Sequence, residues 1–81
     1  MTYKIYFSEK SRKQFKKLAK PVKSQIVRYL ETRVSKSPYD YGKKLKGNFG
    51  ECWRYRVGDY RIICKVENNN LTVIVVEAGH R

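Results

Sequence analysis

The sequence predicts an α+β fold, in which a hairpin of two helices packs on one face of a mainly antiparallel four-stranded sheet. Three observations support this prediction. An alternating segment opens the chain, two segments with helical spacing follow, and three further strand-like segments close it. Because strands and helices are grouped, we expect the order β-α-α-β-β-β in a single domain that spans residues 1–81.

The first strand leads directly into the first helix. Residues 2–7 alternate between two sides, as a strand does, and they are rich in aromatic and β-branched side chains. One side holds Tyr3, Ile5 and Phe7. Ser8 then offers an N-cap, and residues 8–20 place apolar side chains at helical intervals.

The second helix begins near Pro21, since proline suits the first turn of a helix. Its apolar stripe consists of Val22, Ile26, Tyr29, Leu30 and Val34. The residue before a proline avoids helical dihedral angles, so the helix should end before Pro38. We expect residues 37–50 to form a long basic loop, with room for a short strand around residues 44–46.

Three strands should close the chain, over about residues 51–57, 60–66 and 71–77. The first two are joined by Gly58 and Asp59, and glycine is preferred at the first central position of a type II′ hairpin turn. Asn68 and Asn69 would form the second tight turn.

The register of this hairpin separates an apolar face from a basic one. The apolar face, expected to form the core, holds Trp53, Tyr55, Val57, Tyr60, Ile62, Cys64 and Val66. The opposite face holds Arg54, Arg56, Arg61 and Lys65, with Arg56 directly opposite Arg61. Like charges in such a pair destabilise a sheet by about 0.2–1 kcal/mol. A bound polyphosphate would remove the repulsion, so we interpret this face as an anion site.

The last strand departs from alternation, because residues 73–76 are all apolar. Such a run is typical of a central strand that is buried on both faces. The helices can cover only one face, so the other face should expose an apolar patch made of Ile63, Ile74 and Val76. A patch of this kind beside a basic cluster predicts a protein-binding groove.

Charge is the strongest compositional signal. The 19 Lys and Arg residues exceed the seven Asp and Glu, which gives a formal net charge of +12. This excess favours nucleic acid as the partner, with an acidic polypeptide as the alternative. We find no membrane-spanning run and no signal peptide, and Cys52 and Cys64 are expected on opposite faces of the sheet. Unpaired thiols suit a cytoplasmic protein.

Familiar catalytic and metal-binding motifs are missing from the sequence. His80 is its single histidine, which excludes a two-histidine ribonuclease, and the acids and cysteines are too scattered to predict a metal site. Trp53 is better explained as a core residue than as a base-stacking platform. Tyr39 and Tyr41 in the basic loop are candidates for contact with RNA bases. The lysines of the first helix fit either a solvated face or an RNA-binding face.

Three segments resemble the RelE/ParE superfamily of toxins from toxin–antitoxin pairs: KKLKG (43–47), CWRYRVGDYRIICKV (52–66) and VVEAGHR (75–81). The resemblance covers essentially the whole chain and favours the RelE branch. It implies a ribosome-dependent endoribonuclease that cuts mRNA in the decoding site, is neutralised by a cognate antitoxin, and needs no cofactor or metal. In such enzymes the 2′-hydroxyl of the RNA attacks the adjacent phosphodiester and leaves a cyclic phosphate.

The resemblance also implies roles for individual residues. Arg61 and Arg81 would stabilise the charge of the phosphorane, and Arg54 and Arg56 occupy the places of the family's basic strand residues. The residues expected to bind RNA are Lys43, Lys44, Lys46, Lys65, His80 and Tyr41. The antitoxin would cover Ile63, Ile74 and Val76.

One departure from the family pattern lies at the end of the sequence. Related chains usually continue past the Gly-His-Arg motif to a tyrosine that takes part in catalysis, whereas this sequence stops at Arg81. We therefore expect this 81-residue chain to fold but to cleave slowly. Two other functions remain open, a ParE-like toxin that inhibits gyrase and a non-catalytic RNA-binding module of the same fold.

Overall fold

The computed structural model describes residues 2–45 and 52–78. Within these ranges it contains the following elements in chain order: β1 (Lys4–Phe7), α1 (Glu9–Lys16), α2 (Lys20–Tyr29), the π-helical turn η1 (Leu30–Val34), β2 (Lys43–Lys44), β3 (Cys52–Val57), β4 (Tyr60–Glu67) and β5 (Asn70–Ala78). The predicted order of strands and helices is confirmed, with the short β2 added.

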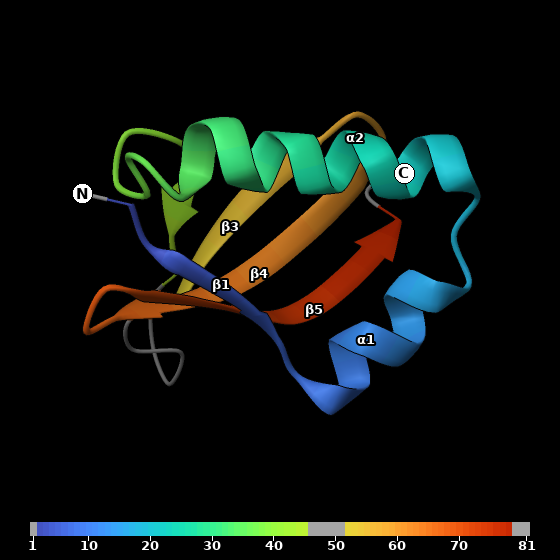
Figure 1. The fold of residues 1–81 in the computed structure, drawn as a ribbon, viewed down its shortest axis with the longest axis horizontal. Helices are drawn as coiled ribbons and strands as arrows, with labels where there is room; N and C mark the ends of the chain where they lie inside the picture. Colours follow the sequence, from blue (N-terminus) through green and yellow to red (C-terminus); the bar gives the residue numbers. More distant parts are fainter. Residues whose placement is uncertain (1, 46–51, 79–81) are drawn as a thin grey trace.

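The strands form one mixed sheet in the order β1-β5-β4-β3-β2. β1 runs parallel to β5, and the other neighbours are antiparallel. Figure 1 shows α2 lying across the sheet while α1 lies beside β5, and the two helices contact different strands, α2 mainly β3 and α1 mainly β5. The α+β fold class is therefore confirmed. The sheet has five strands where four were expected, because Lys43 and Lys44 form the short strand β2 and pair with β3.

The core lies between the sheet and α2 with η1. It is formed by buried side chains from these elements: Ile26, Leu30, Val34, Tyr55, Val57, Ile62, Cys64, Val66, Leu71, Val73 and Val76. Phe7 and Phe15 add an aromatic contact beside it, with ring centroids 5.2 Å apart. Trp53 is half-buried and packs against the core, as expected.

The second helix changes geometry in its last turn. The backbone N–H of Ser35 donates to the carbonyl of Leu30 at 2.7 Å, a bond that spans five residues as in a π-helix. Leu30 and Val34 are both buried in this wider turn. The helix therefore includes the whole predicted apolar stripe, but it ends at Val34, before the predicted end at Pro38, and its last turn is not α-helical.

The two hairpin turns have the expected geometry. Gly58 has a φ of 57°, and Asn68 and Asn69 have φ values of 51° and 64°. Positive φ at both central residues is the signature of a type I′ turn, and the single positive φ at Gly58 fits type II′. The predicted register follows, with Arg56 paired to Arg61 and Trp53 paired to Cys64.

A β-bulge interrupts the pairing of β4 with β5. Ile63 pairs with Val75, but the next residue, Cys64, pairs with Val73. Ile74 is therefore an extra residue without a partner on β4. One extra residue reverses the alternation of side chains along the strand.

This bulge corrects the prediction for Val76. Val76 pairs with Ile62 and is only 4% exposed, so it belongs to the core rather than to the open face of the sheet. The apolar run over residues 73–76 does not require burial on two faces. It arises because Val73 and Val76 point to the same core from opposite sides of the bulge.

Polar side chains of α1 and its N-cap satisfy the backbone of the bulge. The hydroxyl of Ser11 donates to the carbonyl of Val73 at 2.7 Å, and that of Ser8 lies 3.2 Å from the carbonyl of Ile74. The backbone N–H of Val76 donates to the side chain of Gln14 at 2.9 Å. We call Ser8, Ser11 and Gln14 the α1 clasp.

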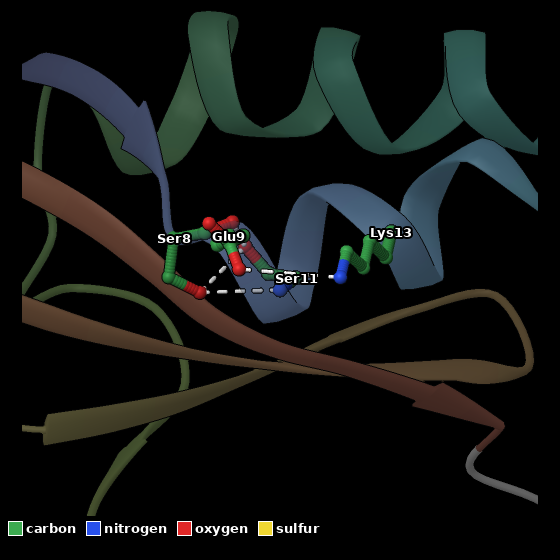
Figure 2. A network of polar contacts seen from close by, with 4 residues as sticks. All are labelled: Ser8, Glu9, Ser11 and Lys13. Atoms are coloured by element: carbon green, nitrogen blue, oxygen red, sulfur yellow. Dashed lines mark hydrogen bonds and ion pairs between the residues drawn. The ribbon is translucent and has the colours of Figure 1, made fainter.

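Ser8 also caps α1, as the sequence predicts. Its hydroxyl oxygen accepts a hydrogen bond from the backbone N–H of Ser11 at 3.1 Å. Figure 2 shows this contact beside the exposed ion pair of Glu9 and Lys13, whose charged atoms are 3.9 Å apart. The exposed pair adds little stability, so the clasp is what fixes α1 against β5.

Candidate functional site

The basic face of the sheet is built by alternation along β3 and β4. Tyr55 and Ile62 point into the core, so Arg54, Arg56 and Arg61 point to the opposite face. Arg54 and Arg61 are half-buried, and Arg56 is exposed. The structure thus brings together the three arginines that the sequence singles out.

These arginines line a cleft of about 410 Å³. Its walls come from α2, β2, β3, β4 and the residue that precedes β2: Tyr29, Gly42, Lys43, Arg54, Arg56 and Arg61. We call it the arginine cleft. Four cationic side chains around one hollow are typical of a site for a polyanion.

Gly42 allows β2 to approach β3 at this point. Its φ is 71°, and a Cβ atom there would lie 2.3 Å from the carbonyl oxygen of Arg54 and 2.7 Å from the ring of Tyr55. No other residue type fits such an approach. The close approach places Lys43 directly opposite Arg54, at the rim of the cleft.

The charge of the cleft is only weakly balanced within the protein. Glu77 lies opposite Arg61 on β5, and their charged atoms are 3.9 Å apart on half-exposed side chains. The Nε atom of Arg61 is buried, and it has no hydrogen-bond acceptor in the described part of the chain. The cleft therefore retains donor capacity that an anionic ligand can use.

Tyr55 supports the floor of the cleft from the core side. Its buried hydroxyl donates to the carbonyl of Pro38 at 2.7 Å and so attaches the loop before β2 to the sheet. Burial raises the pKa of Tyr55 well above its usual value, so the phenol stays neutral. Tyr29 packs edge-on against Tyr41, with ring centroids 6.1 Å apart.

The other predicted RNA-binding residues are not gathered in this cleft. Lys44 is exposed on β2 and pairs with Trp53, and Tyr41 is half-buried against the core. Lys65 lies 3.0 Å from Glu67, and the hydrogen bond between them raises the pKa of Lys65. Further predicted site residues, Lys46, His80 and Arg81, lie outside the described residues.

Sequence reasoning missed two residues of the cleft. The sequence predicts Tyr29 as part of the apolar stripe of the second helix, yet it lines the cleft as well as packing against the core. Gly42 falls within the basic loop predicted for residues 37–50. The only available signal for Gly42 was its position directly before the basic pair Lys43 and Lys44.

The predicted apolar patch differs from the expected one in one residue. Ile63 and Ile74 are half-buried, and Val75 joins them opposite Ile63 in place of Val76. In the described ranges, no three His, Cys, Asp or Glu side chains are placed to hold a metal ion. No helix of residues 2–45 and 52–78 is long and apolar enough to cross a membrane.

Comparison with known proteins places the chain among small toxins. Residues 5–81 match the family described as the ParE toxin of the type II toxin–antitoxin system parDE. The chain is 25% identical over 81 residues to toxin RelG of Mycobacterium tuberculosis, covering 100% of this chain and 93% of that protein. It is 29% identical over 83 residues to the mRNA interferase toxin RelE of Escherichia coli K12, covering 100% and 85%.

A solved structure agrees with the fold. The toxin of the intact RelBE toxin–antitoxin complex of Escherichia coli superimposes with a TM-score of 0.82 at 28% identity. The match covers 98% of this chain and 99% of that chain. The similarity therefore extends over the sheet, both helices and the segments that form the arginine cleft.

Proposed function

Because the chain belongs to the ParE toxin family of type II toxin–antitoxin systems, within the RelE/ParE superfamily, we propose that it is a ribosome-dependent endoribonuclease that cleaves mRNA in the decoding site. One observation carries the proposal: Arg54, Arg56 and Arg61 line a single cleft. A relative of similar length, the RelE toxin of Escherichia coli, is named an mRNA interferase. Such a protein would act in the cytoplasm.

In the proposed reaction, the 2′-hydroxyl of the RNA transfers its proton to water and forms a bond to the adjacent phosphorus. The bond from phosphorus to the 5′-oxygen breaks, the 5′-oxygen leaves with the electron pair and takes up a proton from water as a 5′-hydroxyl, and a cyclic phosphate remains. Arg61, with Arg81, stabilises the negative charge that develops on the phosphorane oxygens, while Arg54 and Arg56 hold the strand. Arginine stays protonated at neutral pH, so these residues supply charge and do not accept the proton.

The remaining predicted residues would bind RNA outside the point of cleavage. Lys43 lines the arginine cleft, and Lys44 and Lys65, which do not line it, add positive charge at exposed positions. Lys46, His80 and Tyr41 complete the proposed RNA-binding set. The net charge of +12 supports contact with a large polyanion such as ribosomal RNA.

We further propose that an acidic, amphipathic antitoxin segment neutralises the chain by covering the basic face together with Ile63 and Ile74. Opposite charges would steer the two proteins together, and the half-buried apolar side chains would become fully covered. Hydrogen exchange of residues 60–75 with and without the antitoxin tests this. Unchanged exchange in β4 and β5 would contradict it.

A coupled translation assay with primer-extension mapping tests the enzymatic function. The expected result is cleavage of mRNA on ribosomes that is reduced by about 10²–10³-fold in an Arg61→Ala variant and retained in Arg12→Ala, at an exposed position on α1. The matching family is described as the ParE toxin, so the ParE-like alternative raised from the sequence, inhibition of gyrase, is the second candidate function. Arrest of replication with intact mRNA would indicate that function, and RNA binding with neither effect would indicate a non-catalytic module.

A further inference from the structure

A second cleft adjoins the arginine cleft, between the helical layer and the tip of the β3–β4 hairpin. Its volume is about 380 Å³. It is lined by Gln25, Arg28, Tyr29, Thr32, Arg33, Arg56, Val57 and Gly58. We call it the α2 groove, because most of these residues lie on α2 and η1.

The two clefts are adjacent. Tyr29 and Arg56 line both of them, so the boundary between the clefts is made of one ring and one guanidinium group. A ligand that extends from the arginine cleft into the α2 groove therefore has only these two side chains to pass. A long, unbranched polyanion is the kind of ligand that such a pair of adjacent hollows fits.

The α2 groove is also cationic, with three cationic side chains where the arginine cleft has four. Arg28, Arg33 and Arg56 line it, and none of the described residues that line it is acidic. Another hollow on the same helix, beside Phe15, is different because Glu31 contributes a carboxylate to its wall. The cationic lining of the α2 groove is therefore a local feature and not a property of every hollow in this basic protein.

The hairpin turn shapes one end of the groove. Gly58 has a positive φ of 57°, and a Cβ atom there would lie 3.3 Å from the Nε2 atom of Gln25. The absence of a side chain lets the turn approach the helix and leaves the amide of Gln25 at the groove. Its N–H groups are donors suited to phosphate oxygens.

From this geometry we propose that the α2 groove binds the sugar–phosphate backbone of the same single-stranded RNA, next to the phosphodiester held in the arginine cleft. The proposal rests on the proposed function, since it assumes that RNA occupies the first cleft. Arg28 and Arg33 contact phosphate oxygens, for which guanidinium groups are well shaped. Arg56, at the boundary, lies between two successive phosphates.

Binding of non-cleavable RNA separates this proposal from the chemistry. Fluorescence anisotropy would measure the affinity of the whole chain for 2′-O-methyl oligoribonucleotides of two and of six nucleotides, over a range of salt concentrations. Because these RNAs lack the attacking hydroxyl, the measurement does not depend on cleavage. We expect the longer RNA to bind more tightly and with a steeper dependence on salt.

Three variants locate the source of this additional affinity. Arg28→Ala with Arg33→Ala should remove most of it and should reduce the salt slope by roughly 0.7 for each phosphate that the variant no longer binds. A matched control, Lys4→Ala with Lys36→Ala, removes the same charge from exposed positions outside both clefts and should retain the additional affinity. Thr32→Trp fills the groove without a change in charge and should abolish it.

The outcomes distinguish the two proposals. If both RNAs bind equally well, or if the control loses as much affinity as the groove variant, the α2 groove is not a binding site. The assignment of RNA to the arginine cleft is then unaffected. If neither RNA binds, the assignment of RNA to the arginine cleft fails as well, and this proposal fails with it. Circular dichroism of each variant confirms that the fold is retained.

Discussion

The α1 clasp and the arginine cleft both lie against the same sheet, but they differ in whether their polar groups have partners within the protein. At the clasp, Ser11 and Gln14 satisfy backbone groups of β5 at 2.7 Å and 2.9 Å. At the cleft, Arg56 lies directly opposite Arg61, whose acidic neighbour, Glu77, is 3.9 Å away. The polar groups of the clasp therefore have partners within the protein, whereas the positive charge of the cleft is only weakly balanced within it.

This difference separates residues that stabilise the fold from residues that are kept for a ligand. A satisfied buried hydrogen bond stabilises the folded state by about 0.5–1.5 kcal/mol. A like-charged pair on a sheet destabilises it. Variants at the clasp should therefore lower stability, and variants in the cleft should lower activity.

The largest expected effect is on activity in the cleft. Arg61→Ala should reduce ribosome-dependent mRNA cleavage by about 10²–10³-fold, because it removes a fixed charge aimed at the phosphorane. Its free energy of unfolding should change by no more than about 0.5 kcal/mol. Primer extension and thermal unfolding measure the two quantities. Wild-type cleavage by the folded variant would remove Arg61 from the proposed active site.

The next effect is on stability at the clasp. Ser11→Ala removes a buried donor from the carbonyl of Val73, and we expect a decrease of about 1–3 kcal/mol in the free energy of unfolding. Urea denaturation measures it. Ser24→Ala, at an exposed position on α2, is the matched control. Equal stability of the two variants would show that the clasp does not support β5.

Tyr55 lies in the core beneath the arginine cleft. Burial raises the pKa of Tyr55 in the folded state, so its contribution to stability is present below the usual tyrosine pKa of about 10 and is lost as pH rises above it. We expect stability to fall by up to about 1.4 kcal/mol per pH unit in that range.

Tyr55→Phe should reveal this contribution. At neutral pH it should cost about 0.5–1.5 kcal/mol, because the carbonyl of Pro38 loses its donor. Above a pH of about 10 its stability should fall less steeply than that of the wild type, although Cys64, whose thiol pKa is also raised by burial, keeps part of the slope. Parallel pH profiles for the two proteins would contradict the assignment.

The smallest effect is the relief of charge repulsion. Arg56→Thr removes one member of the like-charged pair and introduces a residue with high strand propensity, so stability should increase by about 0.2–1 kcal/mol at low salt. The increase should shrink as salt screens the pair. Urea denaturation at two salt concentrations measures it. A decrease in stability would show that Arg56 is not strained by Arg61.

The hairpin of β3 and β4 could be predicted from the sequence almost completely. Glycine at position 58 fixes the turn, and the turn fixes the pairing of Arg56 with Arg61. The residues on each face of the hairpin then follow, because side chains alternate between the two faces along a strand. The arginines of the cleft could be identified for this reason, since only local geometry was needed.

The bulge in β5 could not be predicted in the same way. An apolar run over residues 73–76 fits a strand that is buried on both faces, and it fits equally a bulge that reverses the alternation of side chains. Which of the two forms depends on hydrogen bonds from α1, more than 60 residues away in sequence. Val76 was placed on the wrong face for this reason. Tyr29 and Gly42 were missed because a cleft between separate elements has no local signature.

The parallel pairing of β1 with β5 has a consequence for the order of folding. Ser8 and Ile74 are 66 positions apart, so β1 pairs with a strand that is synthesised much later than β1 itself. Contacts between such distant segments form slowly, because closing the long loop between them costs conformational entropy. On a nascent chain, β1 with Ile5 and Phe7 lacks its pairing strand until β5 has emerged. The native sheet is therefore completed only after β5 has been translated.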